Sequence, residues 1–151
     1  MVPAESEAGV RGDVQRYLEG AASNLGFADW LKSTGRDDPT TVGWAITAAF
    51  YAAVHAVRAY LLARHGVRVG AHTDMPGLQA QHPELNNTAR DYNMLKQESQ
   101  SARYYLNQRF TWADFDKLRA KAARVQATWR PKTEQALQPP PGSPESPGSG
   151  R

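Results

Sequence analysis

The longest apolar pattern in the chain lies between Pro39 and His65 and distinguishes three sides of a helix. At about 100° per residue, one side carries bulky apolar residues, the second carries alanines, and the third carries a polar and aromatic stripe. A helix that is apolar over most of its circumference is typical of the centre of a bundle. We therefore expect a central helix whose polar stripe faces a cleft or a subunit interface. The bulky apolar side consists of Ile46, Phe50, Val54, Val57 and Leu61. The alanine side consists of Ala45, Ala49, Ala52, Ala56, Ala59 and Ala63. The polar and aromatic stripe consists of Trp44, Thr47, Tyr51, His55, Arg58, Leu62 and His65.

Three more helices are expected, because no segment alternates as a convincing strand would. The first covers about Asp13–Leu31, with Asp13 as its N-cap. The next covers about Glu84–Gln108. The last opens at Thr111, where Asp114 three residues on forms a variant of the capping box, and its apolar pattern ends before Pro131.

Local signals mark both ends of the central helix. Asp38 is placed to cap it and Pro39 occupies its first position, where the missing N–H costs nothing. Gly66 is expected to end it. The following stretch, Val67–Pro83, contains two glycines and two prolines and is interpreted as a long connector. His82, which precedes a proline in that stretch, is expected on an exposed loop.

The two ends of the chain are expected to be disordered. Residues 1–12 contain few apolar side chains, and residues 138–151 read QPPPGSPESPGSGR, without a large apolar residue. One domain remains, over residues 13–137. We expect it to be all-α, an up-and-down bundle of four or five helices.

The composition excludes several kinds of chemistry. The chain has no cysteine, which excludes disulfides, thiolate zinc sites and cysteine nucleophiles and fits the cytoplasm. It also lacks the closely spaced histidine and carboxylate pairs typical of helical metal sites, so we expect neither a metal nor a cofactor. Residues 40–57 carry no formal charge, but their alanine-rich content favours a buried helix over a membrane span.

The polar stripe offers the clearest candidate chemistry, since Tyr51, His55, Arg58 and His65 fall on one side of one helix. A histidine near an arginine tends to be neutral and can accept a proton, while the arginine can hold a phosphate. Such a pair can cleave RNA without a metal. The alternative is that the stripe forms the polar side of a dimer interface. His72, beyond the helix end, either docks against this side or caps the next turn.

Basic and aromatic residues suggest two further contacts with nucleic acid. Arg103 and Tyr104 either hold a phosphate and stack a base or pack on the core, with the arginine extended to solvent. Lys117, Lys121 and Arg124 share one flank of the last helix, which is either a phosphate-binding patch or a solvated face. The net charge of +3 is too small to decide between these alternatives.

These stretches together resemble the HEPN superfamily (higher eukaryotes and prokaryotes nucleotide-binding). The resemblance lies in residues 50–61, then Gly66 and His72, then residues 102–104, and then Phe110 and Thr111 before the last helix. It implies an all-α up-and-down bundle that commonly dimerises. Many members are metal-independent ribonucleases or partners of nucleotidyltransferases in toxin–antitoxin and defence systems, and others are non-catalytic binding modules.

Catalytic members of that superfamily carry an arginine followed a few residues later by a histidine. In this chain Arg58 and His65 come closest to that spacing. Our leading hypothesis is a cytoplasmic homodimer that binds RNA, a nucleotide or a partner protein with little or no catalysis. The alternatives are a metal-independent endoribonuclease toxin, using His55 or His65 with Arg58, and a structural adaptor. A nucleotidyltransferase or antitoxin is the expected protein partner.

Overall fold

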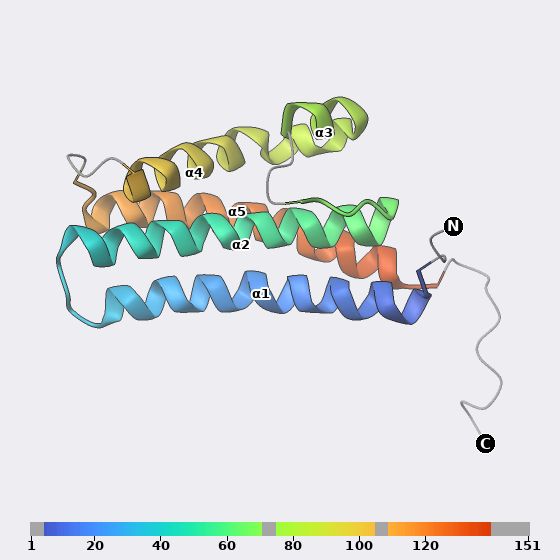
Figure 1. Ribbon diagram of the computed structural model, residues 1–151, viewed down its shortest axis with the longest axis horizontal. Helices are drawn as coiled ribbons and strands as arrows, with labels where there is room; N and C mark the ends of the chain where they lie inside the picture. The colour runs from blue at the N-terminus through green and yellow to red at the C-terminus, as the bar shows by residue number, and fades with distance from the viewer. Residues whose placement is uncertain (1–4, 71–74, 105–108, 140–151) are drawn as a thin grey trace, which may run out of the picture.

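The computed structural model describes residues 5–70, 75–104 and 109–139, and within these ranges it contains helices and no strand. Successive long helices run in opposite directions, so the expected all-α, up-and-down bundle is confirmed (Figure 1). The elements are α1 (Glu7–Ser33), α2 (Pro39–His65), α3 (Met75–Gln81), the 3₁₀ turn η1 (Pro83–Leu85), α4 (Asn86–Tyr104) and α5 (Trp112–Leu137).

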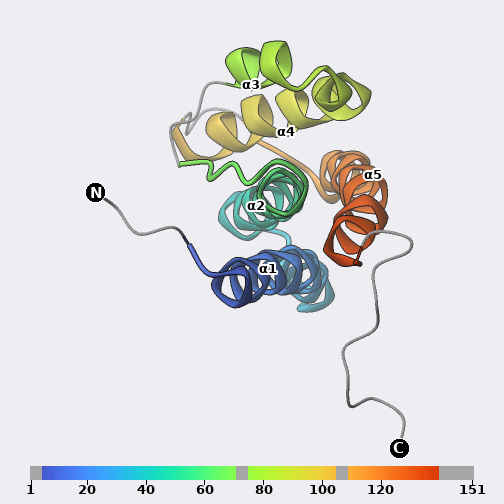
Figure 2. The same ribbon diagram turned by 90° about the vertical axis from the view of Figure 1, so that its right-hand side faces the viewer.

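Helix α2 lies at the centre of the bundle. Seen end-on, it has α1 on one side, α4 on another and α5 beside it (Figure 2). Its alanines, apart from the partly buried Ala63, are almost fully buried, since their small side chains let the neighbouring helices approach closely. The helix is long and apolar enough to cross a membrane by length and composition, but 83% of its most apolar 18-residue window is buried inside the protein. Its position in the core accounts for its apolar sequence.

Both predicted ends of α2 and the predicted start of α5 are confirmed. The Asp38 carboxylate accepts a hydrogen bond from the backbone N–H of Thr41 at 2.9 Å. Gly66 has a φ of 67°, the left-handed conformation that glycine adopts most readily. At α5, the Thr111 and Asp114 side chains each accept a hydrogen bond from the other residue's backbone N–H, which completes the capping box.

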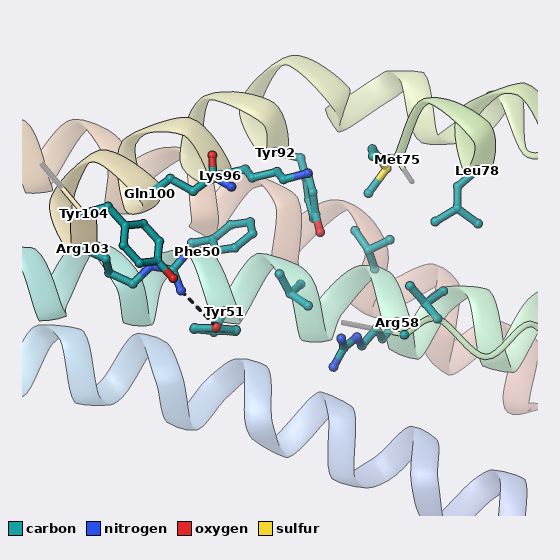
Figure 3. A pocket seen from close by; sticks show the side chains of 14 residues that line it. Phe50, Tyr51, Arg58, Met75, Leu78, Tyr92, Lys96, Gln100, Arg103 and Tyr104 are labelled. Atoms are coloured by element: carbon teal, nitrogen blue, oxygen red, sulfur yellow. Dashed lines mark hydrogen bonds between the residues drawn. The ribbon is translucent and has the colours of Figure 1, made fainter. Parts of the chain in front are cut away.

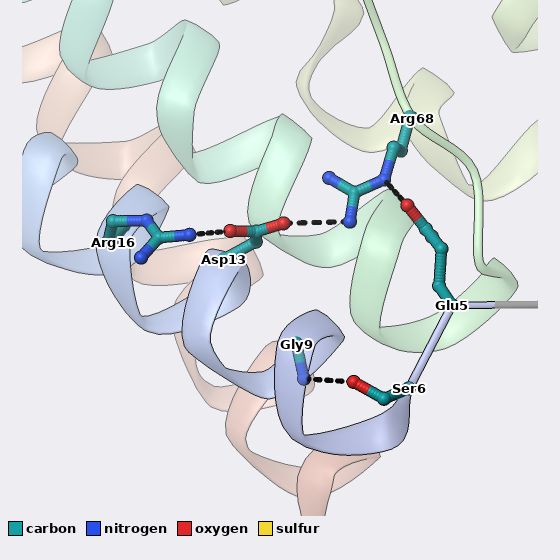
Figure 4. A network of polar contacts seen from close by, with 6 residues as sticks. All are labelled: Glu5, Ser6, Gly9, Asp13, Arg16 and Arg68. Carbon is teal, nitrogen blue, oxygen red and sulfur yellow. Dashed lines mark hydrogen bonds and ion pairs between the residues drawn. The ribbon is translucent and has the colours of Figure 1, made fainter.

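Helix α1 begins six residues earlier than expected, which corrects the interpretation of residues 7–12 as disordered. Ser6 rather than Asp13 caps it, accepting a hydrogen bond from the N–H of Gly9 at 3.0 Å. Asp13 instead pairs with Arg16 and, at 2.7 Å, with Arg68, which follows α2 (Figure 4). Arg68 also contacts Glu5 at 2.6 Å. The two ion pairs of Arg68 tie the N-terminal part of α1, and Glu5 before it, to the segment that follows α2.

The expectation that α5 ends before Pro131 is wrong. The helix continues through that residue to Leu137. Pro131 lies on the exposed side of α5, whereas Trp129 and Thr133 on its other side are fully buried. Packing of this buried side outweighs the missing backbone hydrogen bond. Of the expected C-terminal tail, residues 140–151 lie outside the described ranges.

The connector after α2 contains a short helix that the sequence analysis missed. In α3, Met75 and Leu78 are buried three residues apart, and Pro76 occupies the first turn, where proline is tolerated. The next long helix begins at Asn86 rather than Glu84, because residues 83–85 form the 3₁₀ turn. Its expected end at Gln108 lies outside the described residues.

Candidate functional site

A cavity of about 520 Å³ opens between α2, α3 and α4 (Figure 3). Its volume falls within the range of roughly 300–1,000 Å³ that is common for small-molecule sites. Helix α2 supplies one wall and α4 supplies the facing wall, while α3 together with Val69 and Gly70 lines one end. The lining residues are Phe50, Tyr51, Val54, Val57, Arg58, Val69, Gly70, Met75, Leu78, Tyr92, Lys96, Gln100, Arg103 and Tyr104.

The cavity is positively charged. Arg58, Lys96 and Arg103 line it, and none of its described lining residues is a carboxylate. Arg58 is half-buried, and its Nε atom is buried without a hydrogen-bond partner in the described part of the chain. A buried guanidinium N–H without an acceptor is costly. The positive charge of Arg58 adds to those of Lys96 and Arg103 and favours an anionic ligand in the cavity.

Arg103 joins the two walls of the cavity. Its Nη1 donates a hydrogen bond to Tyr51 Oη at 3.3 Å, and its Nε donates to the backbone oxygen of Ser99 at 3.3 Å (Figure 3). Its guanidinium carbon also lies 5.4 Å from the centre of the Tyr104 ring, a cation–π contact. Tyr104 is 72% exposed. The arrangement places a cation and two phenol rings together, both of them exposed to solvent.

Tyr92 contributes a neutral phenol deeper in the cavity. Burial raises its pKa to about 12, with the charge of Arg58 acting in the opposite direction. The Phe50 ring meets the Tyr92 ring edge-on, with centroids 5.6 Å apart. Because its phenol stays protonated at neutral pH, Tyr92 can donate a hydrogen bond to an anion without adding charge of its own.

His55 is separated from this cavity. Its ring stacks on Tyr17 of α1 with centroids 6.0 Å apart, and it is not among the lining residues. Burial, and then the charge of Arg58, lower its pKa, so His55 is neutral at physiological pH. The neutral state agrees with the sequence analysis. The sequence analysis also placed His55 beside a phosphate-binding arginine. In the structure, the His55 ring instead packs between α1 and α2.

His65 does not join Arg58 either. Its Nε2 lies 2.6 Å from a carboxylate oxygen of Glu84, and its ring lies 4.3 Å from that of His82, centroid to centroid. His82 is half-buried, contrary to the expected exposed loop position.

The stripe on α2 is therefore divided among several environments. The prediction that all of it faces one cleft is wrong, whereas the dimer-interface alternative stays a prediction. Tyr51 and Arg58 line the cavity, whereas Thr47 and Leu62 are buried in the core. Trp44 is exposed. His72, expected near this site, lies outside the described residues.

The three cations predicted as a patch on α5 are partly neutralised. Asp91 of α4 pairs with Arg124 at 3.0 Å and lies 3.5 Å from Lys121. The hydrogen bond from Arg124, together with both positive charges, holds the pKa of Asp91 below its ordinary value. Lys117 and Lys121 both line a second hollow. This arrangement favours the solvated-face alternative for Arg124 and Lys121.

The sequence analysis named neither Tyr92 nor Lys96 as a candidate site residue. A sequence signal for both was present, because Tyr92, Lys96 and Gln100 follow one another at intervals of four. Such spacing places them on one face of α4, where Arg103 also lies. All four line the cavity.

Comparisons with family models, with curated proteins and with solved structures yield no match to this chain. The functional argument therefore rests on the all-α bundle and on the geometry of its cationic, tyrosine-lined cavity.

Proposed function

We propose that this chain is a HEPN-like bundle that binds a nucleotide, alone or as a unit of RNA, in the cavity between α2, α3 and α4. The observation that carries the proposal is the set of three cations in this cavity, including an arginine with an unpartnered buried N–H. Guanidinium groups bind phosphate oxygens through charge-assisted hydrogen bonds. The order of the helices is in keeping with the HEPN resemblance.

The position of the phenol rings favours a nucleotide over a small inorganic anion. Tyr51 and Tyr104 lie beside Arg103 at one end of the cavity, and Arg58 lies two helical turns further along α2. Seven residues of helix span about 10 Å. A ligand that contacts both ends is therefore elongated, with a ring for the tyrosines beside Arg103 and a phosphate for Arg58 at the other end.

The environment of the histidines favours binding over cleavage. Among the described residues that line the cavity there is no histidine to transfer a proton. His55 packs against α1, and His65 pairs with Glu84. An RNA-binding module fits this arrangement better than a metal-independent endoribonuclease does.

Calorimetric titration with AMP, ATP and a short oligoribonucleotide at low salt tests the proposal. We expect Arg103→Ala and Lys96→Ala each to weaken binding about tenfold or more, because each removes a charge-assisted contact. Affinity should also fall as salt is added. Arg90→Ala is the matched control, since Arg90 is an exposed cation on α4 that does not line the cavity.

Two results would contradict nucleotide binding in the cavity. One is the absence of binding by the parent chain to all three ligands. The other is equal weakening by Arg90→Ala and Arg103→Ala, which would reduce the effect to overall charge. Cleavage of the oligoribonucleotide by the parent chain would instead support the endoribonuclease alternative.

The homodimer and the protein partner remain predictions that accompany this proposal. Three exposed aromatic side chains, Phe27, Trp30 and Trp44, lie at the end of the bundle where α1 connects to α2. Exposed aromatic residues often mark surfaces that another chain covers. Sedimentation of the parent chain and of a Trp30→Ser, Trp44→Ser double variant tests whether a second copy covers them. A nucleotidyltransferase or antitoxin partner would be tested by copurification.

A further inference from the structure

Three side chains with metal-binding atoms meet where α2 ends and η1 begins. His65 is the last residue of α2, His82 precedes η1, and Glu84 lies within it. One ligand atom from each lies within 4.8 Å of the other two. The contact between His65 and Glu84 is the closest described one, at 2.6 Å. None of the three lines the cationic cavity, so the cluster is a separate feature of the molecule.

The second observation is an unsatisfied nitrogen in the same cluster. His82 Nε2 is buried and has no hydrogen-bond partner within the described ranges. Buried polar atoms in proteins almost always have a partner. His82 is also held against a second imidazole, since its ring centre lies 4.3 Å from that of His65. A bound cation would give the histidine nitrogens and the carboxylate a common partner.

We propose that His65, His82 and Glu84 bind a divalent transition-metal ion of the zinc class. Two imidazole nitrogens and one carboxylate oxygen are ligands that zinc prefers, whereas magnesium and calcium prefer oxygen alone. Zinc bonds of about 2.0–2.2 Å in a tetrahedral site place the ligand atoms about 3.4 Å apart. The required side-chain shifts are on the order of 1 Å, within rotamer adjustment. A fourth position remains for water or another ligand.

The surroundings of Glu84 suit such a site. Tyr60 Oη donates a hydrogen bond to Glu84 Oε1 at 3.1 Å, and Tyr60 itself packs on Trp129, with ring centres 4.4 Å apart. The same oxygen lies 2.6 Å from His65 Nε2. These contacts hold the carboxylate in one orientation, as the outer partners of a metal ligand do.

A metal at this cluster would fix the connector between α2 and α4. The ion would join the end of α2 to η1, and the connector between them includes α3. Met75 and Leu78 of α3 line one end of the cationic cavity. Metal binding would consequently restrain that end of the cavity without contributing a ligand inside it.

Titration of the full chain, freed of metal by a chelator, tests the site directly. We expect one zinc ion per chain at neutral pH and no binding of magnesium. We expect His82→Gln and Glu84→Gln each to weaken zinc binding tenfold or more. Cobalt(II) should give the visible absorption of a tetrahedral site in the parent chain, and this absorption should be lost in both variants. His55→Gln is the matched control, because it removes a histidine that packs against α1 instead.

Absence of zinc binding by the parent chain would overturn the proposal. So would zinc binding of unchanged affinity in a His65→Gln, His82→Gln double variant. Circular dichroism establishes that each variant remains helical, and Glu84→Gln provides a readout that keeps both histidines. Because the titration contains no nucleotide, its result is independent of the proposed ligand of the cationic cavity.

Discussion

Gly20 of α1 and the His55 ring of α2 are in direct contact. A Cβ atom built on Gly20 would lie 3.3 Å from His55 Cδ2, closer than an ordinary van der Waals contact. Tyr17, one turn earlier on α1, covers the same ring. The absence of a side chain at residue 20 therefore lets the imidazole pack between the two helices.

Substitution of Gly20 tests this contact. We expect Gly20→Leu to lower the free energy of unfolding by about 1–3 kcal/mol, because the leucine must displace the His55 ring or separate the helices. Gly26→Leu is the matched control, since Gly26 lies on the same helix with nothing near its missing Cβ. That change should raise stability by about 0.5–1 kcal/mol through helix propensity. Urea unfolding measures both, and equal effects would contradict the contact.

The lowered pKa of His55 makes stability depend on pH. Burial and then Arg58 disfavour the imidazolium in the folded chain, so the unfolded chain binds more protons just below the ordinary histidine pKa. Stability contributed by neutral His55 is therefore complete above about pH 6.5 and is lost as the pH falls toward the folded-state pKa. Urea unfolding at several values between about pH 7.5 and pH 5 should show this decline.

The His55→Gln variant isolates this contribution. Glutamine does not titrate, so the decline should be smaller in the variant than in the parent chain. Hydrogen-bonded carboxylates such as Asp91 and Asp114 have pKa values below their ordinary range. The stability that they contribute to the folded chain is lost only at lower pH. Parallel pH profiles for parent and variant would show that His55 does not cause the effect.

The course of the long helices could be predicted from the sequence because the relevant signals are local. Apolar spacing in α2, the Asp38 and Gly66 caps, and the Thr111 capping box each involve residues within one or two turns. These signals locate both ends of α2 and the start of α5, whereas the signals at Asp13 and Pro131 misplaced the start of α1 and the end of α5. They do not decide which neighbour covers each of its sides.

The content of the site could not be predicted, because it depends on how α2 is rotated against its neighbours. His55 and Arg58 lie only three residues apart, yet α1 covers the first while the second lines the cavity. Similarly, His65 contacts Glu84, which lies 19 residues later in the sequence. No periodicity predicts such a contact. It follows from the path of the connector, in which the short helix α3 was not expected.

Pro131 gives a prediction about the cost of a proline inside a helix. Pro131→Ala restores a backbone N–H within α5 and removes the clash with the preceding turn, at an exposed position where no packing is lost. We expect thermal unfolding to show a gain of about 1–2 kcal/mol, after allowing for greater freedom of the unfolded chain. Pro139→Ala, beyond the helix, should have little effect. A loss of stability in Pro131→Ala would indicate that the proline positions the last turns of α5.

Trp129 and Thr88 connect α5 to α4 through a buried hydrogen bond. Trp129 is fully buried, and its Nε1 donates to Thr88 Oγ1 at 2.8 Å. Thr88→Val keeps the shape of the side chain but leaves the indole N–H without an acceptor. We expect the free energy of unfolding to fall by about 1–3 kcal/mol, the cost of stranding a buried donor. Thr128→Val is the matched control, because its hydroxyl donates only to the backbone oxygen of Arg124 and its loss strands no donor. Denaturant unfolding with tryptophan fluorescence measures both variants. Equal losses would indicate that the missing hydroxyl itself, rather than the stranded indole N–H, determines the cost.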